Sequence, residues 1–202
     1  TVNAYESMGC VNDGSANDNE SAVKALSKWP NDQYYNVWVV HKINNQNFRT
    51  QGGTAGYAYF PGAGSNIDGT VIHVLASGYD PPNAHGWDLN ERNNGTLVHE
   101  LGHAFSLHHT FNGGDNSPGG NCPPNGDCST TGDNVCDTDP HVGDLGTCRV
   151  PGDPNGCTGG VYDVNISDNF MNYTNCDPLL FTPGQKDRFI AVLSPGGGRY
   201  SL

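Results

Sequence analysis

HELGHAFSLHH, residues 99–109, is the most informative stretch of this chain for both its architecture and its chemistry. His99 and His103 are four residues apart, and on a helix this spacing places both side chains on one face, in consecutive turns. Glu100 is next to the first histidine, where its carboxylate can reach a water molecule on a shared metal ion without binding the metal. Two imidazole ligands beside a general base are typical of a zinc site that performs hydrolysis.

A third zinc ligand has to come from outside this pair, and the sequence limits the choice. Some zinc hydrolases take a glutamate from a later helix, but no glutamate follows Glu100 in this chain. An aspartate ligand remains open, because Asp is abundant downstream. His109 lies six residues after His103 and is the simplest third ligand, with its neighbour His108 as the alternative. We therefore predict a zinc site of three histidines with one coordination position left for water.

The composition excludes several classes of protein. The net charge of −12 argues against nucleic acid as a partner, because nucleic-acid binding depends on Lys and Arg. No stretch reaches the roughly 18 apolar residues of a membrane span. The chain begins at Thr1 without a signal peptide, as a mature or trimmed form would. With 202 residues, 28 Gly and 13 Pro, it is expected to form one loop-rich domain and to act as a monomer.

Seven cysteines, six of them between residues 122 and 176, indicate the compartment. None forms a CxxC pair, which argues against a zinc ribbon or a thioredoxin-like motif. Clustered cysteines in a loop-rich segment are typical of disulfides and hence of an oxidising environment. We therefore expect a secreted, extracellular protein, although the connectivity of its disulfides does not follow from the sequence.

Hydrophobic patterns predict an α+β domain with a mixed sheet and helices packed on it. The expected elements are a short helix, three strands, the zinc-binding helix and a final helix, over residues 21–29, 34–43, 54–61, 69–76, about 93–106 and 182–193. Pro61, which ends the second strand, indicates an edge position. At the final helix Thr182 is a good N-cap, Gln185 completes a capping box, and Phe181 can add a hydrophobic staple.

Residues 111–181 differ in character from the rest of the chain. They contain ten Asp, six Cys and one basic residue, Arg149, and they show no convincing long helix or strand. A segment of this length without secondary structure is unusual in a compact domain unless cross-links or metal ions hold it. Disulfides and calcium would both do so, because Asp in Gly- and Asn-rich loops forms turns or binds hard cations.

Several segments together resemble the pappalysin branch of the metzincin zinc metalloproteases, the ulilysin-like family. They are HELGHAFSLHHTF at 99–111, GDNVCDT at 132–138, NFMNYT at 169–174 and FTPGQ at 181–185, together with the upstream GYAYFPG and DGTVIHV. The resemblance covers most of residues 34–193. It implies a metzincin-type α+β fold in a single catalytic domain, 1–202. An upper lobe, 1–109, would hold a twisted mixed sheet and the active-site helix, and a loop-rich, disulfide-stapled lower lobe, 110–202, would hold the Met-turn and the final helix.

The resemblance also implies roles for three residues outside the histidines. Met171 would form the Met-turn, a hydrophobic floor beneath the zinc, where a lone Met would otherwise be an ordinary core residue. Tyr173 resembles the tyrosine whose phenol lies near zinc in several metzincins, and it would stabilise the transition state. Ser106 departs from the family, which has Gly where the chain leaves the helix. A non-glycine residue in the left-handed conformation costs about 1 kcal/mol, so we expect a strained or adjusted turn in an active enzyme.

The activity implied by the resemblance is that of a zinc endopeptidase, with protein or peptide substrates. Glu100 would accept a proton from the attacking water and pass it to the departing amine. The substrate would lie extended and pair with the edge strand near Gly56–Phe60, and Asp177 is a candidate for selecting basic side chains. The alternative from another class is an extracellular binding module, stabilised by calcium and disulfides, in which the zinc is structural.

The acidic loop 127–139 is the candidate calcium site, by its composition and by resemblance to the family's calcium site near GDNV. Asp133, Thr138 and the carbonyl group of Val135 are the candidate ligands, because Ca²⁺ prefers oxygen donors of these kinds. The alternative is that these acidic side chains form a solvated surface.

The family pattern suggests two disulfides among four cysteines, which would tie the loop to the Met-turn region: Cys136, Cys148, Cys157 and Cys176. Cys122 and Cys128 are six residues apart and could close a local loop. Cys10 is then left over. It is either an unpaired buried residue or a thiolate that caps the zinc in a latent form of the enzyme.

Overall fold

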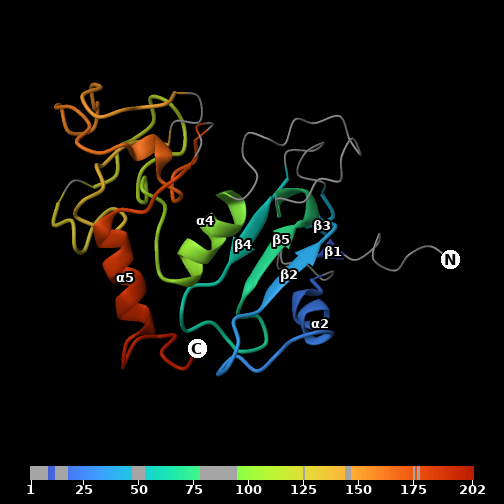
Figure 1. The fold of residues 1–202 in the computed structure, drawn as a ribbon. Coiled ribbons are helices and arrows are strands. Elements are labelled where there is room, and N and C mark those ends of the chain that lie inside the picture. The colour runs from blue at the N-terminus through green and yellow to red at the C-terminus, as the bar shows by residue number, and fades with distance from the viewer. Residues whose placement is uncertain are drawn as a thin grey trace. The chain divides into compact units, whose positions relative to one another are not determined.

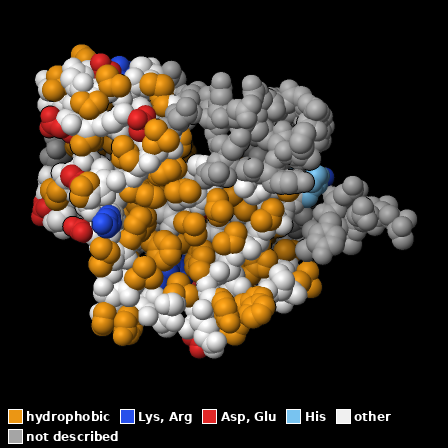
Figure 2. Space-filling model, in the orientation of Figure 1, with side chains coloured by type: hydrophobic (Ala, Val, Ile, Leu, Met, Phe, Trp, Pro, Cys, Tyr) orange, Lys and Arg blue, Asp and Glu red, His pale blue; other side chains and the backbone are white. Residues whose placement is uncertain are grey.

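A computed structural model describes residues 9–11, 18–46, 53–77, 95–124, 126–143, 147–174, 176 and 178–202 of the chain (Figure 1). The chain forms two compact units, one of Thr1–Phe105 together with Val192–Leu202, and the other of Ser106–Ala191. In the described residues, the first unit contains the named strands and the second consists mainly of loops and turns. On the face drawn in Figure 2, most acidic side chains lie over the loop-rich unit, which agrees with the concentration of Asp between residues 111 and 181.

The first unit is built on a three-stranded mixed sheet, as the hydrophobic patterns predicted. Its strand order is β2 (Val37–Val40), β5 (Thr70–His73) and β4 (Gly56–Ala58), with β2 parallel and β4 antiparallel to β5. Among the described residues β4 lies at an edge, as expected from Pro61. A second, parallel pair consists of β1 (Gly9–Cys10) and β3 (Lys42–Ile43).

All three strands that were predicted from the sequence are longer than the strands found in the structure. The stretch 34–43 is divided into β2 and β3, because β3 pairs with β1 and not with β5. The stretch 69–76 ends in a 3-10 helix, Val74–Ala76. The stretch 54–61 keeps only β4, since Ala58 pairs with Thr70, the first residue of β5, and the ladder ends there. The predictions were too long because the apolar pattern continues past the residues that have a partner strand.

Helix α2 (Glu20–Ala25) is also shorter than the predicted helix 21–29. The predicted end at Trp29 is excluded by Asn36, whose side-chain amide binds both backbone groups of Trp29. The Trp29 N–H donates to Asn36 Oδ1 over 2.8 Å, and Asn36 Nδ2 donates to the Trp29 carbonyl oxygen over 2.9 Å. These bonds hold the segment before β2 in a non-helical conformation, which the apolar spacing could not indicate.

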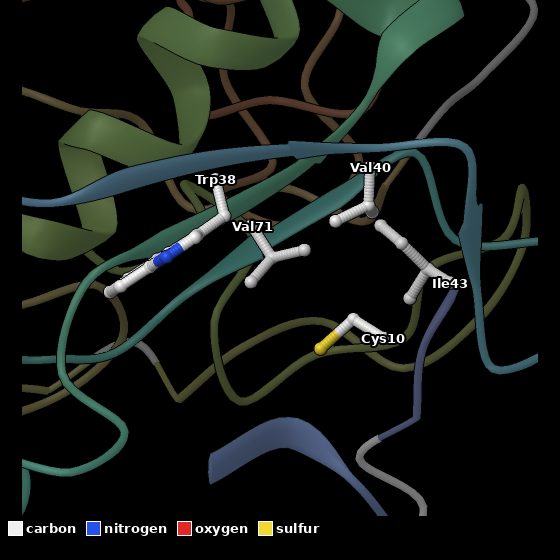
Figure 3. Packing of buried hydrophobic residues seen from close by; sticks show 5 residues of the cluster. All are labelled: Cys10, Trp38, Val40, Ile43 and Val71. Atoms are coloured by element: carbon white, nitrogen blue, oxygen red, sulfur yellow. The ribbon is translucent and has the colours of Figure 1, made fainter. Parts of the chain in front are cut away.

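The core of the first unit lies between the sheet and α2. Figure 3 shows five buried side chains gathered on one side of the strands: Cys10, Trp38, Val40, Ile43 and Val71. The other face of β5 and β4 is covered by helix α4 (Gly95–Ala104) (Figure 1). All four residues of β5 are consequently buried, as expected for a central strand covered on both faces. Each large apolar side chain buried here contributes roughly 1.5–3 kcal/mol.

A buried ion pair attaches α2 to the sheet. Lys24 and Glu20, one turn apart on the helix, form a salt bridge of 2.7 Å with almost no exposed surface. Glu20 also accepts hydrogen bonds from the hydroxyls of Tyr57 and Tyr59, over 2.8 and 2.7 Å. The Lys24 ammonium lies 4.7 Å from the centre of the Tyr59 ring and 5.0 Å from that of Trp38. Every charge in this cluster is therefore compensated, as burial requires, and the side of β4 that faces α2 is held in place.

Three disulfides cross-link the second unit, and they correct the suggested pairings. The bonds are Cys122–Cys157, Cys128–Cys136 and Cys148–Cys176, with Cα–Cα distances of 5.4, 4.9 and 5.7 Å. The predicted bond between Cys122 and Cys128 is wrong, because each of these residues pairs with a different cysteine. Two bonds were predicted within the other four cysteines, and the structure contains one, Cys148–Cys176. The physical reason is that pairing depends on which Cα atoms the folded loops bring within bonding range, and separation in the sequence does not report this.

Helix α5 (Pro183–Leu193) begins with the predicted capping box. Gln185 N–H donates to Thr182 Oγ1 over 3.2 Å, and Thr182 N–H donates to Gln185 Oε1 over 2.9 Å. Asp137 adds a second cap that the sequence did not indicate, because its carboxylate accepts hydrogen bonds from Thr182 Oγ1 and from the N–H of Gly184. A carboxylate at a helix N-terminus is also favoured by the helix dipole.

Replacement of both Cys148 and Cys176 by alanine is expected to lower the free energy of unfolding by about 3.5 kcal/mol, because this bond closes a loop with a separation of 28 residues. Removal of the Cys128–Cys136 bond, with a separation of 8 residues, is expected to cost about 2.5 kcal/mol. Urea unfolding of the two double variants measures both losses. A larger loss for the shorter loop would contradict loop-closure entropy as the main contribution.

Candidate metal centre and active site

Helix α4 presents the first two histidines of the predicted zinc site. His99 is buried and His103 is half-buried, and their rings lie 4.8 Å apart between centroids, at an angle of 90°. The helix ends at Ala104, one residue after the second histidine. The four-residue spacing therefore places both imidazoles on one face of the helix, in consecutive turns, as predicted.

His109 completes a cluster with these two residues. One ring nitrogen from each of His99, His103 and His109 lies within 4.8 Å of the other two. In a tetrahedral zinc site, metal–nitrogen bonds of about 2.1 Å separate the ligand nitrogens by about 3.4 Å, so the three imidazoles fit around one zinc ion. His108 is not a member of the cluster. In the described part of the chain, neither a carboxylate nor a thiol joins these histidines as a fourth group.

Ser106 forms the turn that leads from α4 to the third histidine. Its φ of 75° lies in the left-handed region, so the expected strained turn is confirmed. Arg188 of α5 donates to the Ser106 carbonyl oxygen from Nε, over 3.2 Å, and from a terminal nitrogen, over 2.8 Å. Hydrogen bonds to a charged group contribute about 1.5–3 kcal/mol, which exceeds the cost of about 1 kcal/mol for a non-glycine residue in this conformation.

Glu100 is buried against the edge strand. Its side chain lies so close to β4 that a methyl group on Gly56 would be 3.1 Å from Glu100 Cγ and 3.2 Å from the Val71 carbonyl oxygen. Only glycine leaves ordinary van der Waals space at that position. Burial raises the pKa of Glu100 to about 8. A divalent cation nearby would act in the opposite direction, because positive charge favours the carboxylate.

The segment that was predicted to form the Met-turn is a buried turn held by several hydrogen bonds. Met171 has no exposed surface, its N–H donates to Asn169 Oδ1 over 2.9 Å, and its carbonyl oxygen accepts from the Thr110 N–H over 3.1 Å. Asn169 and Gln185 join their side-chain amides by two hydrogen bonds, of 2.8 and 3.1 Å. Gln185 therefore connects the Met-turn to the first turn of α5. The sequence indicated only its role in the capping box and did not point to Asn169.

Tyr173 lies next to the third histidine. The ring centres of Tyr173 and His109 are 4.5 Å apart. Phe111 also stacks on the His109 imidazole, with ring centres 4.9 Å apart and an angle of 12° between the planes. The Tyr173 side chain keeps 37% of its surface exposed. A phenol in this position has access to solvent and to a ligand bound near His109.

The candidate calcium residues lie together in one loop. Asp133 is buried, its Oδ1 accepts the Val135 N–H over 3.1 Å, and its Oδ2 lies 2.7 Å from the Thr138 hydroxyl. That hydroxyl is also 2.9 Å from the Val135 carbonyl oxygen. These residues line a cavity of about 170 Å³ together with Thr131, Gly132 and Asp139. Because Asp133 is buried, the solvated-surface alternative is wrong for this carboxyl group. Burial also raises the pKa of Asp133 to about 6.

Cys10 is a core residue of the first unit. It forms no disulfide, it has no exposed surface, and its Sγ lies 3.1 Å from the Tyr57 hydroxyl. Burial raises the pKa of the Cys10 thiol, which favours the neutral form over the thiolate that binds zinc. Of the two interpretations of Cys10, the structure therefore supports an unpaired buried residue. Asp177, the candidate for selecting basic side chains, lies outside the described residues.

Comparisons with known proteins agree with this geometry. The family Peptidase_M43, described as Pregnancy-associated plasma protein-A, matches residues 17–194. An extracellular metalloprotease of Pyricularia oryzae is 32% identical over 149 residues, which are 71% of this chain and 44% of the relative. Extracellular metalloprotease 1 of Coccidioides posadasii is 31% identical over 197 residues, which are 94% of this chain and 60% of the relative.

Solved structures point in the same direction. Mature mirolysin of Tannerella forsythia, in complex with a cleaved peptide, superposes with a TM-score of 0.61 at 27% identity, over 86% of this chain and 57% of that one. The chain thus spans about half the length of the relatives it matches. The expected metzincin-type α+β fold is confirmed by this likeness.

The expected extracellular setting is also confirmed, by the names of the relatives together with the three disulfides. Among the described residues, no helix has the length and apolar character needed to cross a bilayer. The matched family, which covers residues 17–194, agrees with the motifs at 99–111, 132–138 and 169–185. The chain therefore belongs to the pappalysin family of metallopeptidases, Peptidase_M43.

Proposed function

We propose that this chain is the catalytic domain of a secreted zinc endopeptidase in which His99, His103 and His109 hold the metal. The observation that most supports this function is the cluster of three imidazoles with Glu100, the only other ionisable residue of HELGH, buried beside it on the same helix. Zinc bound by three neutral histidines lowers the pKa of water toward roughly 7 and polarises a carbonyl group.

The residues of the chain supply the remaining steps. Glu100 accepts the proton of the attacking water and delivers it to the nitrogen of the departing amine. The Tyr173 hydroxyl donates a hydrogen bond to the oxyanion that forms at the scissile carbonyl, a role supported by its ring contact with His109. Met171 provides the apolar floor of the site.

An extended peptide would pair with the edge of β4. Peptides commonly add a strand to an exposed sheet edge, where backbone hydrogen bonds supply affinity. β4 is suited to this because its Gly56 lies against Glu100, so a peptide strand bound there passes alongside the general base. The bonds from Tyr57 and Tyr59 to Glu20 keep the strand fixed from the opposite side.

A binding module with structural zinc is the competing function. A structural zinc site is closed by a fourth protein ligand, whereas a catalytic site keeps a position for water. The absence of a fourth donor from the cluster, in the residues that the structure describes, supports catalysis. Zinc-dependent cleavage of casein tests the choice: cleavage that is lost with a chelator and restored by zinc is expected, and zinc binding without any cleavage would contradict the enzyme.

We also propose that Asp133, Thr138 and the Val135 carbonyl group bind a structural calcium ion. The support is the convergence of these oxygens on one loop and the burial of a carboxyl group there, since a buried carboxylate needs a compensating charge.

Removal of calcium, with zinc restored, is expected to lower the melting temperature. A ligand present at 100 times its Kd stabilises the folded state by about 2.7 kcal/mol, which corresponds to roughly 5–10 °C in a chain of this size. Differential scanning calorimetry with and without calcium measures the shift, and Asp133→Asn serves as the control that abolishes it. A melting temperature that is indifferent to calcium would contradict the site.

A further inference from the structure

Arg188 binds the turn after α4 through several hydrogen bonds at once. Its Nε and a terminal nitrogen donate to the Ser106 carbonyl oxygen, the same terminal nitrogen lies 3.2 Å from Ser106 Oγ, and the other donates to the Asn134 carbonyl oxygen over 3.3 Å. Ser106 and Asn134 both have left-handed backbones, with φ of 75° and 61°. One guanidinium group thus binds two residues whose conformation L-amino acids rarely adopt.

We propose that Arg188 is a positioning residue for the metal centre: it holds Ser106 in the left-handed conformation and thereby places His109 for zinc binding. The proposal rests on the proposed function in that it takes the three histidines as the zinc ligands. Arg188 itself would touch neither the metal nor the substrate.

The route from Arg188 to His109 is short and anchored at both ends. Ser106 is held by Arg188, and Thr110, directly after the histidine, donates its N–H to the Met171 carbonyl oxygen. Leu107 between them is 1% exposed. Loss of one anchor leaves only the other to determine where the His109 ring lies, and a planar guanidinium that binds one carbonyl twice supplies orientation as well as attraction.

The charge of Arg188 is not by itself the relevant property. A helix that merely needed a cation near its partner loop would accept any basic side chain, whereas the observed bonds use three nitrogens on two carbonyl groups and one hydroxyl. Lysine can reach one of these acceptors at a time. Glycine at position 106 would make the contacts less necessary, because glycine takes the left-handed conformation at little cost.

The first test measures zinc affinity in the Arg188→Met, Arg188→Lys and Lys186→Met variants by competition with a chromophoric chelator. Arg188→Met is expected to weaken zinc binding about 10- to 100-fold, the usual effect of losing a group that orients a metal ligand, and Arg188→Lys to recover part of it. Lys186 is exposed on the same helix, so its substitution controls for lost charge and should leave zinc affinity unchanged. Equal affinities in all three variants and the wild type would overturn the proposal.

The second test combines Arg188→Met with Ser106→Gly or Ser106→Ala. If Arg188 acts by holding the left-handed turn, Ser106→Gly should restore at least half of the lost affinity on a logarithmic scale, and Ser106→Ala should not. Strictly additive effects in this cycle would show that the two residues act independently and would overturn the mechanism. Circular dichroism of each apo-protein separates a folding defect from a displaced ligand.

Failure of the proposed function would look different. A wild-type chain that binds zinc but cleaves no peptide would contradict the endopeptidase and leave the comparison of zinc affinities intact. Conversely, active wild-type enzyme with unchanged zinc affinity in Arg188→Met would overturn only the positioning role.

Discussion

Glu100→Gln is expected to lower kcat for peptide cleavage by at least about 10²–10⁴-fold, the usual contribution of a general base, while zinc stays bound. Glutamine has nearly the same shape and can occupy the same buried space beside Gly56. Its amide cannot accept the proton of the attacking water, so the step fails although the metal ligands are untouched. Steady-state kinetics on a quenched fluorescent peptide, with zinc content by atomic absorption, measure both quantities.

The control for this variant is Asp187→Asn, which removes an exposed carboxylate from α5. It should leave both kcat and zinc content at the wild-type values. Undiminished proteolysis by the Glu100→Gln protein would remove Glu100 from the mechanism. Loss of zinc from the variant would instead assign Glu100 a role in metal binding.

Arg199→Met is expected to lower the free energy of unfolding by up to about 3–5 kcal/mol, because it leaves the half-buried carboxylate of Asp68 without its charged partner. Arg199 is 5% exposed and forms bonds of 2.8 and 2.7 Å with the two carboxylate oxygens of Asp68. It also donates to the carbonyl oxygens of Tyr59 and Ala104, over 3.0 and 2.6 Å. Ala104 is the last residue of α4, so the same side chain satisfies a carbonyl group at the end of the histidine helix.

Chemical unfolding of Arg199→Met, Asp68→Asn and the double variant measures the coupling. The double variant should lose less stability than the two single losses combined, since it removes both charges together. Additive losses would contradict a direct pair. Burial alone would raise the pKa of Asp68, but the bonds and charge of Arg199, with hydrogen bonds from Asn31 and Gly69, together lower that pKa. The pair therefore stabilises the wild type above about pH 4, and its contribution is lost as pH falls through the lowered pKa.

In Arg199→Met this pH dependence should be weaker. The hydrogen bonds and charge of Arg199 no longer lower the pKa of Asp68, so less stability depends on keeping that carboxyl group ionised. The difference in stability between variant and wild type is consequently smallest in acid and largest near neutral pH. Unfolding curves at several pH values check this, and a difference independent of pH would contradict it.

Features that depend on neighbours within one helical turn were predictable. The positions of His99 and His103 on one face follow from 3.6 residues per turn, and the capping box of Thr182 and Gln185 spans three residues. In both cases the two groups that interact are tied together by a few bonds of backbone, so their spacing in the sequence is nearly their geometry. The left-handed turn at Ser106 was expected from the resemblance to the pappalysin family, which has Gly at this position.

Contacts between distant segments were not predictable in this way. The disulfide partners, the reach of Arg188 to Ser106 across 82 residues and that of Arg199 to Ala104 across 95 depend on how the loops fold back. The same holds for Asn36, which binds the backbone of Trp29, and for Asn169, whose side chain is joined to that of Gln185. Local spacing thus specified which residues form the metal site, and long-range packing decided which side chains hold it in place, because no periodic pattern links groups so far apart in the chain.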